Sequence, residues 1–332
     1  MSMSIILGVD GGNTKTIALI ATTKGRIIGA ARRGCGDIYG AGGTQAALDE
    51  IELVVDHALR QAGCGRADLD VACFSLAGAD WPEDYTFLQN AMQDYRFGRR
   101  ITVCNDSLGA LRAGTPDGTG VVISCGTGIA TAARNPDGMF WHSGFWQEPL
   151  CGIELGNQAL RVIYRSEMGI DPPTSLKGPV LRHFGLDSVE ALLHNFTRRD
   201  GSPPTAIEMS KLAPIVLHEA DAGDALASQI VMRHGALLAE YALAAARKVY
   251  LDRTAFTLIL NGGIFRHPGQ QLIEAIRAQI TTVCADIVPV RSRHEPAVGA
   301  VLLALETADI EITPTLISSL EQSLPSNDLF RT

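Results

Sequence analysis

Apolar residues follow two alternating patterns along the 332-residue chain. Short runs rich in β-branched residues predict strands, and stretches whose apolar positions recur every three or four residues predict helices. In the stretch 44–62, for example, Leu48, Ile51 and Val55 share one helical face, and Gly63 follows as a stop signal. Because the two patterns alternate along the chain, they predict an α/β protein.

The predicted elements form two sets, separated by a turn-forming Gly-Thr-Pro-Asp-Gly stretch at 114–118. The first set comprises strands at 5–9, 16–22, 26–31, 70–76 and 101–104 and helices at 44–62, 84–94 and 107–113. The second comprises strands at 120–125, 129–134, 139–142, 256–260 and 283–289 and helices at 154–168, 205–220, 224–250, 268–280 and 295–307. We therefore expect domains at 1–114 and 115–305. The tail at 306–332 is expected to pack back on the first domain and to be loose at its end.

Both sets begin with the same plan. GVDGGNTKTIALIATTKGRIIGA (8–30) and VISCGTGIATAARNPDGMFWHSG (122–144) each read as strand, polar glycine turn, strand, second turn and strand. Two copies of this plan predict two related lobes that face each other. A cleft between two α/β lobes is a natural place for a ligand.

The glycine turns of the two copies are candidate anion sites. Such turns present backbone N–H groups without a side chain in the way, and hydroxyl or ammonium groups beside them add to the attraction. The residues concerned are Gly11, Gly12, Asn13, Thr14 and Lys15 in the first turn and Gly126, Thr127 and Gly128 in the second. For each turn alone, an ordinary β-hairpin turn is the alternative. Neither turn matches a Walker A loop, so the predicted phosphate-binding site is of a different type.

Four carboxylates follow predicted strands. Asp10 directly precedes the first turn and suits Mg²⁺, which prefers one or two carboxylates together with phosphate oxygens. Asp106 starts a helix, where it is either an N-cap or a general base that takes the proton of a sugar hydroxyl during phosphoryl transfer. Asp37 and Asp80 suit hydrogen bonds to sugar hydroxyls, and a plain turn residue is the alternative for Asp80.

A third glycine pair, Gly262 and Gly263, follows the strand predicted at 256–260. Its small residues allow a flat ligand such as adenine to approach the backbone, and a plain strand-to-helix turn is the alternative.

Composition narrows the class of protein. The net charge of -8 disfavours a nucleic-acid partner, and no apolar run reaches the ~18 residues of a membrane span. The chain starts without the pattern of a signal peptide, so we expect a cytoplasmic protein. The seven cysteines form no CxxC pair and are interpreted as reduced core residues, with a metal or iron–sulfur site as the alternative.

Together these segments resemble the BadF/BadG/BcrA/BcrD-type ATPase family, and within it the N-acetylglucosamine kinases of the actin, hexokinase and Hsp70-like superfamily. GVDGGNTKT and SCGTG are similar to its two phosphate motifs, CNDSLGA to the strand with the catalytic Asp, NGGIF to the adenosine motif and EPAVGA to the connecting helix. The resemblance implies two ribonuclease-H-like lobes with ATP and Mg²⁺ in the cleft between them. It also implies a small-molecule sugar substrate and a homodimer.

The resemblance further implies a role for individual residues. It makes Asp106 the base that activates the sugar hydroxyl and assigns Asp10 to Mg²⁺. It assigns phosphate binding to Gly12, Asn13, Thr14, Gly126 and Thr127. The expected substrate residues are Asp37, Gly78, Asp80, Asp106 and Glu154.

Two positions depart from the family's amino-sugar kinases. Those kinases usually carry an Asn where this chain has Asp37, and a GDEG motif where it has Gly-Ile-Glu-Leu-Gly at 152–156, so Ile153 replaces an Asp and Glu154 is kept. An amide offers both donors and an acceptor, whereas a carboxylate only accepts. We therefore expect a different hexose or amino sugar, such as one with a free amine.

Two other functions stay open. The family's other branch comprises ATPase activators of 2-hydroxyacyl-CoA dehydratases, which hold an iron–sulfur cluster through two cysteines per subunit, and no match to those loops is found here. A non-catalytic sugar or nucleotide sensor is the second alternative. The intact Asp106 and both phosphate turns favour a kinase.

Overall fold

The structure, a computed structural model, describes residues 4–40, 42–126, 128–148, 150–201, 204–284 and 286–330. It divides into two compact units. Unit 1 comprises Met1–Thr119 and Ser292–Thr332, and unit 2 comprises Gly120–Arg291. The segment 292–305, which the sequence analysis grouped with the second domain, packs on unit 1 in this structure because its helix covers the sheet of that unit.

Unit 1 contains a five-stranded sheet in the order β3-β2-β1-β4-β5. β2 is antiparallel to both β1 and β3, whereas β1, β4 and β5 run parallel. The strands are β1 (Ile5–Gly11), β2 (Thr16–Thr22), β3 (Ile27–Arg33), β4 (Leu69–Leu76) and β5 (Arg100–Asn105). The helices are α1 (Gly43–Ala62), α2 (Pro82–Asp94), α3 (Asp106–Gly114), α11 (Pro296–Thr307) and α12 (Pro314–Ser323).

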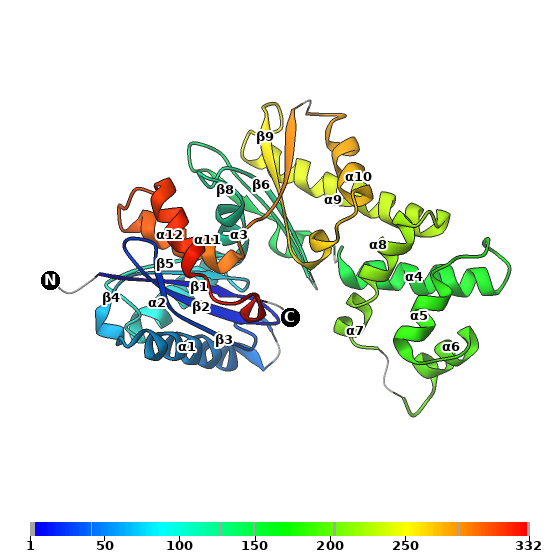
Figure 1. Cartoon of the computed structure of the whole chain (residues 1–332), viewed down its shortest axis with the longest axis horizontal. Helices are drawn as coiled ribbons and strands as arrows, with labels where there is room; N and C mark the ends of the chain where they lie inside the picture. Colours follow the sequence, from blue (N-terminus) through cyan, green and yellow to red (C-terminus); the bar gives the residue numbers. More distant parts are fainter. Residues whose placement is uncertain are drawn as a thin grey trace. The chain divides into compact units, whose positions relative to one another are not determined.

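Both faces of this sheet are covered by helices (Figure 1). Ile5 and Leu7 of β1 belong to the apolar layer that includes buried side chains of α1 and α2. Ile6, between them, belongs to the layer formed with α11 and α12. Side chains alternate between the two faces of a strand, so burial of both faces requires the nearly continuous apolar runs seen in the sequence.

Helix α11 lies unusually close to its neighbours. A Cβ atom at Gly8 of β1 would overlap the backbone of Val301, and a Cβ atom at Gly299 would overlap the carbonyl oxygen of Gly109 in α3. Glycine at these positions therefore permits the backbones of β1, α3 and α11 to pack in direct contact. This contact fixes α3, which begins at Asp106, against the sheet.

The C-terminal segment contains a helix, α12, that the sequence analysis did not predict. Thr313 caps α12 through its hydroxyl, which accepts a hydrogen bond from the N–H of Leu316 at 3.2 Å. Leu316, Leu320 and Phe330 are buried in the same apolar layer as α11. The apolar residues between the polar ones thus dock on unit 1 as far as Phe330, and the end of the chain, which was expected to be loose, lies outside the described residues.

Unit 2 contains a second five-stranded sheet in the order β10-β9-β6-β7-β8. β7 is antiparallel to β6 and β8, whereas β6, β9 and β10 are parallel. The strands are β6 (Gly120–Cys125), β7 (Ile129–Arg134), β8 (Phe140–His142), β9 (Phe256–Asn261) and β10 (Ile287–Arg291). This order repeats that of unit 1, which confirms both the internal repeat and the predicted fold of two ribonuclease-H-like lobes.

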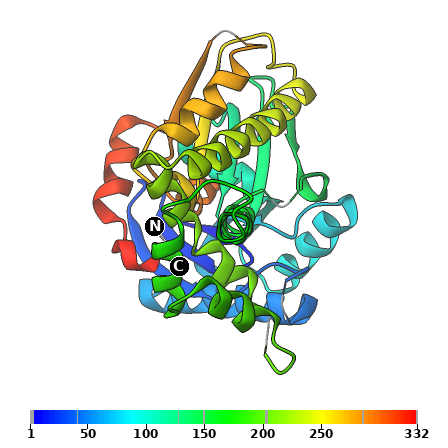
Figure 2. The same cartoon turned by 90° about the vertical axis from the view of Figure 1, so that its right-hand side faces the viewer.

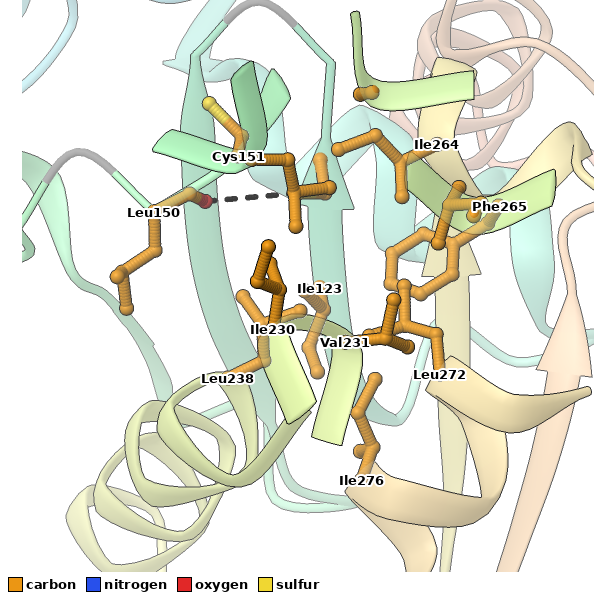
Figure 3. Close-up of a cluster of buried hydrophobic side chains, with 14 of the residues drawn as sticks. Ile123, Leu150, Cys151, Ile230, Val231, Leu238, Ile264, Phe265, Leu272 and Ile276 are labelled. Carbon is orange, nitrogen blue, oxygen red and sulfur yellow. Dashed lines mark hydrogen bonds between the residues drawn. The ribbon is translucent and has the colours of Figure 1, made fainter. Parts of the chain in front are cut away.

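Seven helices of unit 2 lie within the residues that the structure describes. They are α4 (Gly152–Glu167), α5 (Lys177–Phe184), α6 (Val189–Thr197), α7 (Ala206–Ser210), α8 (Ala213–Asp221), α9 (Ala225–Lys248) and α10 (Gln271–Ile280). Figure 2 shows α9, in yellow-green, beside α10, in orange. Their apolar faces meet strand β6 around Ile123, and Val231 of α9 and Leu272 of α10 lie in this cluster (Figure 3).

Unit 2 differs from the prediction in three respects. The sequence analysis did not predict α5 and α6, because helices of 8 and 9 residues are too short for a clear apolar periodicity. The helix expected at 205–220 is divided into α7 and α8, and Pro214 lies in the first turn of α8, where proline is tolerated. The last strand lies at Ile287–Arg291, later than the expected 283–289.

A membrane span needs a long and uniformly apolar helix, and none occurs in the described part of the chain. The seven cysteines are unbridged, and Cys73, Cys104, Cys125, Cys151 and Cys284 are buried as small core residues.

We predict that Gly299→Ala destabilises the protein by about 1–3 kcal/mol, because the added methyl group overpacks the contact between α11 and Gly109. In an open helix the same change would stabilise by roughly 0.5–1 kcal/mol. Urea unfolding measures the difference. Gly65→Ala is the control, because a Cβ at Gly65 meets only an ordinary contact at 3.7 Å. A Gly299→Ala variant at least as stable as the wild type would contradict the close packing.

Candidate active site

The parallel strands of unit 1 end at the same edge of the sheet. Gly11 at the end of β1 pairs with Leu76 at the end of β4, which pairs with Asn105 at the end of β5. The segments that follow these strands are the first glycine turn, the loop 77–80 and helix α3. Ligands of open α/β sheets bind at this carboxyl edge. The candidate residues of unit 1 therefore gather where the fold favours a site.

Backbone hydrogen bonds join these segments. The N–H of Ala77 donates to the carbonyl of Gly11 at 2.8 Å, and the N–H of Gly36 donates to the carbonyl of Gly12 at 3.1 Å. Gly78 packs so tightly that a Cβ atom there would lie 2.7 Å from Asp37 Oδ1. The loops with Asp37 and Asp80 are thus held beside the first glycine turn.

The first glycine turn is closed by a hydrogen bond from the N–H of Gly12 to the carbonyl of Lys15 at 3.0 Å. Asn13 and Thr14 at its tip are exposed, as a ligand contact requires. The Lys15 ammonium donates to the carbonyl oxygen of Phe330, in the C-terminal segment. Its predicted phosphate contact stays a prediction.

Asp106 is the first residue of α3, and the N-cap is Asn105. The side chain of Asn105 accepts the N–H of Ser107 at 3.1 Å, so the interpretation of Asp106 as an N-cap is wrong. The Asp106 carboxylate also accepts backbone N–H groups of the first turn of α3, which favour its charged form. Burial and the negative charge of Asp37 outweigh them and raise the pKa of Asp106 to about 6.

The other carboxylates at this edge lie close enough to influence one another. Burial, followed by the charge of Asp106, raises the pKa of Asp10 to about 7, and Lys15 opposes the shift. Burial, followed by Asp106 and Asp37, raises the pKa of Asp80 to about 7. Asp37 is only 6% exposed, and its carboxylate accepts the N–H of Tyr39 at 3.0 Å. Such shifts are concentrated at functional sites.

Several residues at this edge were not identified from the sequence. Tyr39 donates its hydroxyl to the Asp84 carboxylate at 2.9 Å, and Asp84 accepts the N–H of Trp81 at 2.8 Å. Glu295 adds negative charge near Asp10. Asn105 donates to Asp80 as well as capping α3. The Asn-Asp-Ser run at a strand end is a capping signal that was assigned to Asp106 and fits Asn105 equally well, whereas nothing local in the sequence links Tyr39 to Asp84.

Unit 2 brings together the second glycine turn, the Asn-Gly-Gly segment and the N-terminus of α4. The Asn261 amide donates to Ser124 Oγ at 3.0 Å, which joins the Asn-Gly-Gly segment to the second glycine turn. Gly262 has a φ of 99°, and a Cβ atom there would overlap the backbone of Cys125, so only glycine fits. Gly263 opens the short helix that follows.

The N-terminus of α4 meets the same turn. The N–H of Gly152 donates to the carbonyl of Gly126 at 3.2 Å, and the N–H of Gly126 donates to the carbonyl of Gly128 at 2.9 Å. Glu154 lies in the first turn of α4 and accepts the Gln158 amide at 2.6 Å. A glycine turn beside a helix N-terminus is a favourable environment for phosphate. Thr127, also predicted to bind phosphate, lies outside the described residues.

The comparisons with known proteins identify the family. The model of the BadF/BadG/BcrA/BcrD ATPase family matches residues 7–304. The chain belongs to this ATPase family. The resemblance inferred from the motifs is thereby confirmed, and the matched range includes both glycine turns, Asp106 and the Asn-Gly-Gly segment of this BadF/BadG/BcrA/BcrD ATPase.

Relatives of this ATPase cover most of its length. N-acetyl-D-glucosamine kinase of Dictyostelium discoideum is 25% identical over 321 residues, which are 92% of this chain and 99% of the relative. N-acetylmuramic acid/N-acetylglucosamine kinase of Clostridium acetobutylicum is 24% identical over 311 residues, 92% of this chain and 100% of the relative. The solved structure of a candidate N-acetylglucosamine kinase from Chromobacterium violaceum has a TM-score of 0.66 at 23% identity and covers 92% of this chain and 100% of its own. That structure supports the fold.

One carboxylate of the site, that of Asp10, has surroundings that would suit Mg²⁺ bound together with phosphate. Among the residues that the structure describes, no group of three or more His, Cys, Asp or Glu side chains is placed to hold a metal. Mg²⁺ instead takes one or two carboxylates together with phosphate oxygens and water. Asp10, half-buried and close to Asp106, fits that requirement.

We predict that Asp10→Asn stabilises this ATPase at pH 8 by roughly 1–2 kcal/mol, allowing for its partial exposure. The pKa of Asp10 in the folded chain is about 7, above the value of ~3.9 expected when unfolded. The folded state therefore binds more protons between these values, and the wild type loses stability as the pH rises through that window.

Thermal unfolding at pH 5 and pH 8 measures the effect, which should be about a third as large at pH 5, where only the start of that window has been crossed. Asp49→Asn on the exposed face of α1 is the control and should show no such pH dependence. Equal stabilisation by Asp10→Asn at both pH values would rule out a buried, uncompensated charge.

Proposed function

We propose that the protein is an ATP-dependent kinase that phosphorylates a hydroxyl of a hexose or amino sugar, similar to N-acetylglucosamine and glucosamine kinases. The observation that carries this proposal is the position of Asp106, at the edge of the sheet of unit 1, beside the first glycine turn and the loops with Asp37 and Asp80. Membership of an ATPase family and the named activities of the relatives support it.

Asp106 is the proposed general base. A sugar hydroxyl is a weak nucleophile, and a carboxylate that accepts its proton as the oxygen attacks the γ-phosphorus of ATP removes this obstacle. The oxygen–phosphorus bond forms while the bond to ADP breaks, and Asp106 holds the proton. With a pKa of about 6, Asp106 is charged at neutral pH and basic enough to take part.

The remaining site residues divide between substrate and nucleotide. We assign the sugar to Asp37, Gly78, Asp80 and Glu154. We assign ATP to Gly11, Gly12, Asn13, Thr14, Lys15, Gly126, Thr127, Gly128, Gly262 and Gly263. Asp10 would hold Mg²⁺, which neutralises phosphate charge when bound.

We also propose that the enzyme is a cytoplasmic homodimer.

A colourless protein that releases ADP only with sugar supports the kinase. A brown, cluster-bearing protein that hydrolyses ATP without sugar supports the activator-type ATPase instead. Sugar binding without ADP release across a broad panel of sugars supports the sensor.

We predict that Asp106→Asn lowers kcat by roughly 10²–10⁴-fold, the usual contribution of a general base, and leaves ATP binding nearly unchanged. Asn keeps the shape of the side chain but does not accept the proton. Coupled ADP detection and equilibrium titration of ATP measure the two effects. Turnover within a few-fold of the wild type would remove Asp106 from the role of base.

We predict two effects of Asp37→Asn. The acid limb of the pH–rate profile moves to lower pH, because the negative charge of Asp37 raises the pKa of Asp106. The preference between glucosamine and N-acetylglucosamine moves toward the N-acetyl sugar by roughly tenfold, because an amide donates to the acetyl carbonyl and no longer attracts an ammonium group.

Kinetics with both sugars over a range of pH measure these effects. Asp70→Asn is the control, since Asp70 lies at the opposite end of β4 and accepts Ser4 Oγ at 2.7 Å. An unchanged sugar preference together with an unchanged acid limb would exclude Asp37 from the site.

A further inference from the structure

Asn105 connects two parts of the proposed site of unit 1. It is the last residue of β5, is 3% exposed, and directly precedes Asp106. Its Oδ1 accepts the N–H of Ser107 at 3.1 Å and also the Ser107 hydroxyl. Its Nδ2 lies 3.2 Å from the carbonyl oxygen of Ala79 and 3.3 Å from Asp80 Oδ1. The oxygen and the nitrogen atom of this one buried amide therefore both form hydrogen bonds.

The two ends of this amide have different requirements. The N-terminus of α3 needs an acceptor, which Asp, Ser or Asn supplies about equally well as an N-cap. The loop 77–80 presents a carbonyl and a carboxylate, which both need a donor. Asn meets both needs at once. An ionised Asp has no donor, and the hydroxyl of Ser, one bond closer to the backbone than Asn Nδ2, is too short to reach the two acceptors of the loop. Capping alone does not account for the choice of Asn.

The loop held by Asn105 carries two of the proposed sugar residues. Gly78 packs against the buried carboxylate of Asp37, and Asp80 is itself one acceptor of the Asn105 amide. The same amide fixes the first turn of α3, and hence the carboxylate of Asp106. A general base acts only within hydrogen-bond reach of its proton, and small misplacements of reacting groups lower rates strongly.

We propose that Asn105 is a positioning residue, which couples the loop Gly78–Asp80 to the base Asp106 so that the sugar and the base are held in register. This role rests on the proposed function, because it requires the loop to contact the sugar. Asn105 itself touches neither substrate nor reacting atoms in this account. It acts through the loop on one side and through α3 on the other.

We call the hydrogen bonds from Asn105 Nδ2 to the loop 77–80 the tether, and the bond from Ser107 N–H to Asn105 Oδ1 the cap. The variants Asn105→Asp and Asn105→Ser separate the effects of the two. Both variants keep a side chain that caps α3, and both lose the amide group that reaches the loop, because Asp has no donor when ionised and Ser is one bond shorter. Asp also adds a charge beside Asp80, whereas Ser does not. The tether predicts the same result for both variants, and an effect of the added charge predicts a result for Asp alone.

The matched control is Gln89→Glu. Gln89 lies on α2, and its amide likewise donates to a backbone carbonyl, that of Ile101, at 3.0 Å. The change again replaces an amide by a carboxylate and removes one donor to a carbonyl. Ile101 lies near the start of β5, whereas the proposed site lies at the end of that strand.

Steady-state kinetics should show a split between the substrates. For both Asn105 variants we expect the KM for the sugar to rise roughly tenfold, as expected when one or two hydrogen bonds that orient a binding loop are lost, and the KM for ATP to stay within about twofold. Gln89→Glu should leave both KM values unchanged. Equal rises in both KM values, no rise, or a rise with Asp alone would overturn the positioning role.

Hydrogen exchange tests the tether independently of activity. In Asn105→Ser we expect faster exchange of the amides of Ala77 and Ala79, whose N–H groups are bonded in the wild type, while Ser107 stays protected by the cap. Unchanged exchange in the loop would overturn the tether. If the wild type releases no ADP with any sugar, the proposed function fails, and the exchange result still decides whether the tether exists.

Discussion

The account depends on one constraint, the burial of like-charged carboxylates at the carboxyl edge of β1, β4 and β5. Parallel pairing places the ends of these strands side by side, so Asp10, Asp80 and Asp106 lie close together. Burial raises the pKa of all three, and so does a neighbouring carboxylate, which is Asp106 for Asp10 and Asp80 and is Asp37 for Asp106. A fold keeps such an arrangement at the expense of stability, which is the usual signature of a functional site.

The surrounding structure holds this arrangement in place. Glycine at positions 8 and 299 lets α11 pack directly on β1 and on Gly109 of α3, and this packing fixes the helix that carries Asp106. Asn105 caps that helix and ties it to the loop with Asp80. Unit 2 uses the same devices for its second glycine turn, where Gly262 fits against Cys125 and Asn261 bonds to Ser124. In each unit, glycine residues allow two backbone segments to touch, and an asparagine side chain forms hydrogen bonds that join two segments of the site.

Much of this architecture could be predicted from the sequence, because the two repeated strand–turn–strand segments carry strong local signals. The glycine turns, Asp106 and the Asn-Gly-Gly segment are local motifs, and the structure brings them together within each unit. The features that could not be predicted from the sequence are those that depend on tertiary packing. The helix α12 forms because Leu316 and Leu320 are buried in the apolar layer that also contains α11, and the bond between Tyr39 and Asp84 joins residues 45 positions apart. No local pattern reports such long-range partners.

The most direct test of the central claim is the fate of the γ-phosphoryl group. The purified protein would be incubated with ATP, Mg²⁺ and single sugars, including glucosamine and N-acetylglucosamine, and the sugars would be analysed by mass spectrometry alongside ADP. The account predicts one sugar that gains one phosphoryl group for each ADP formed. ADP formed without a phosphorylated sugar, or no ADP with any sugar, would contradict it.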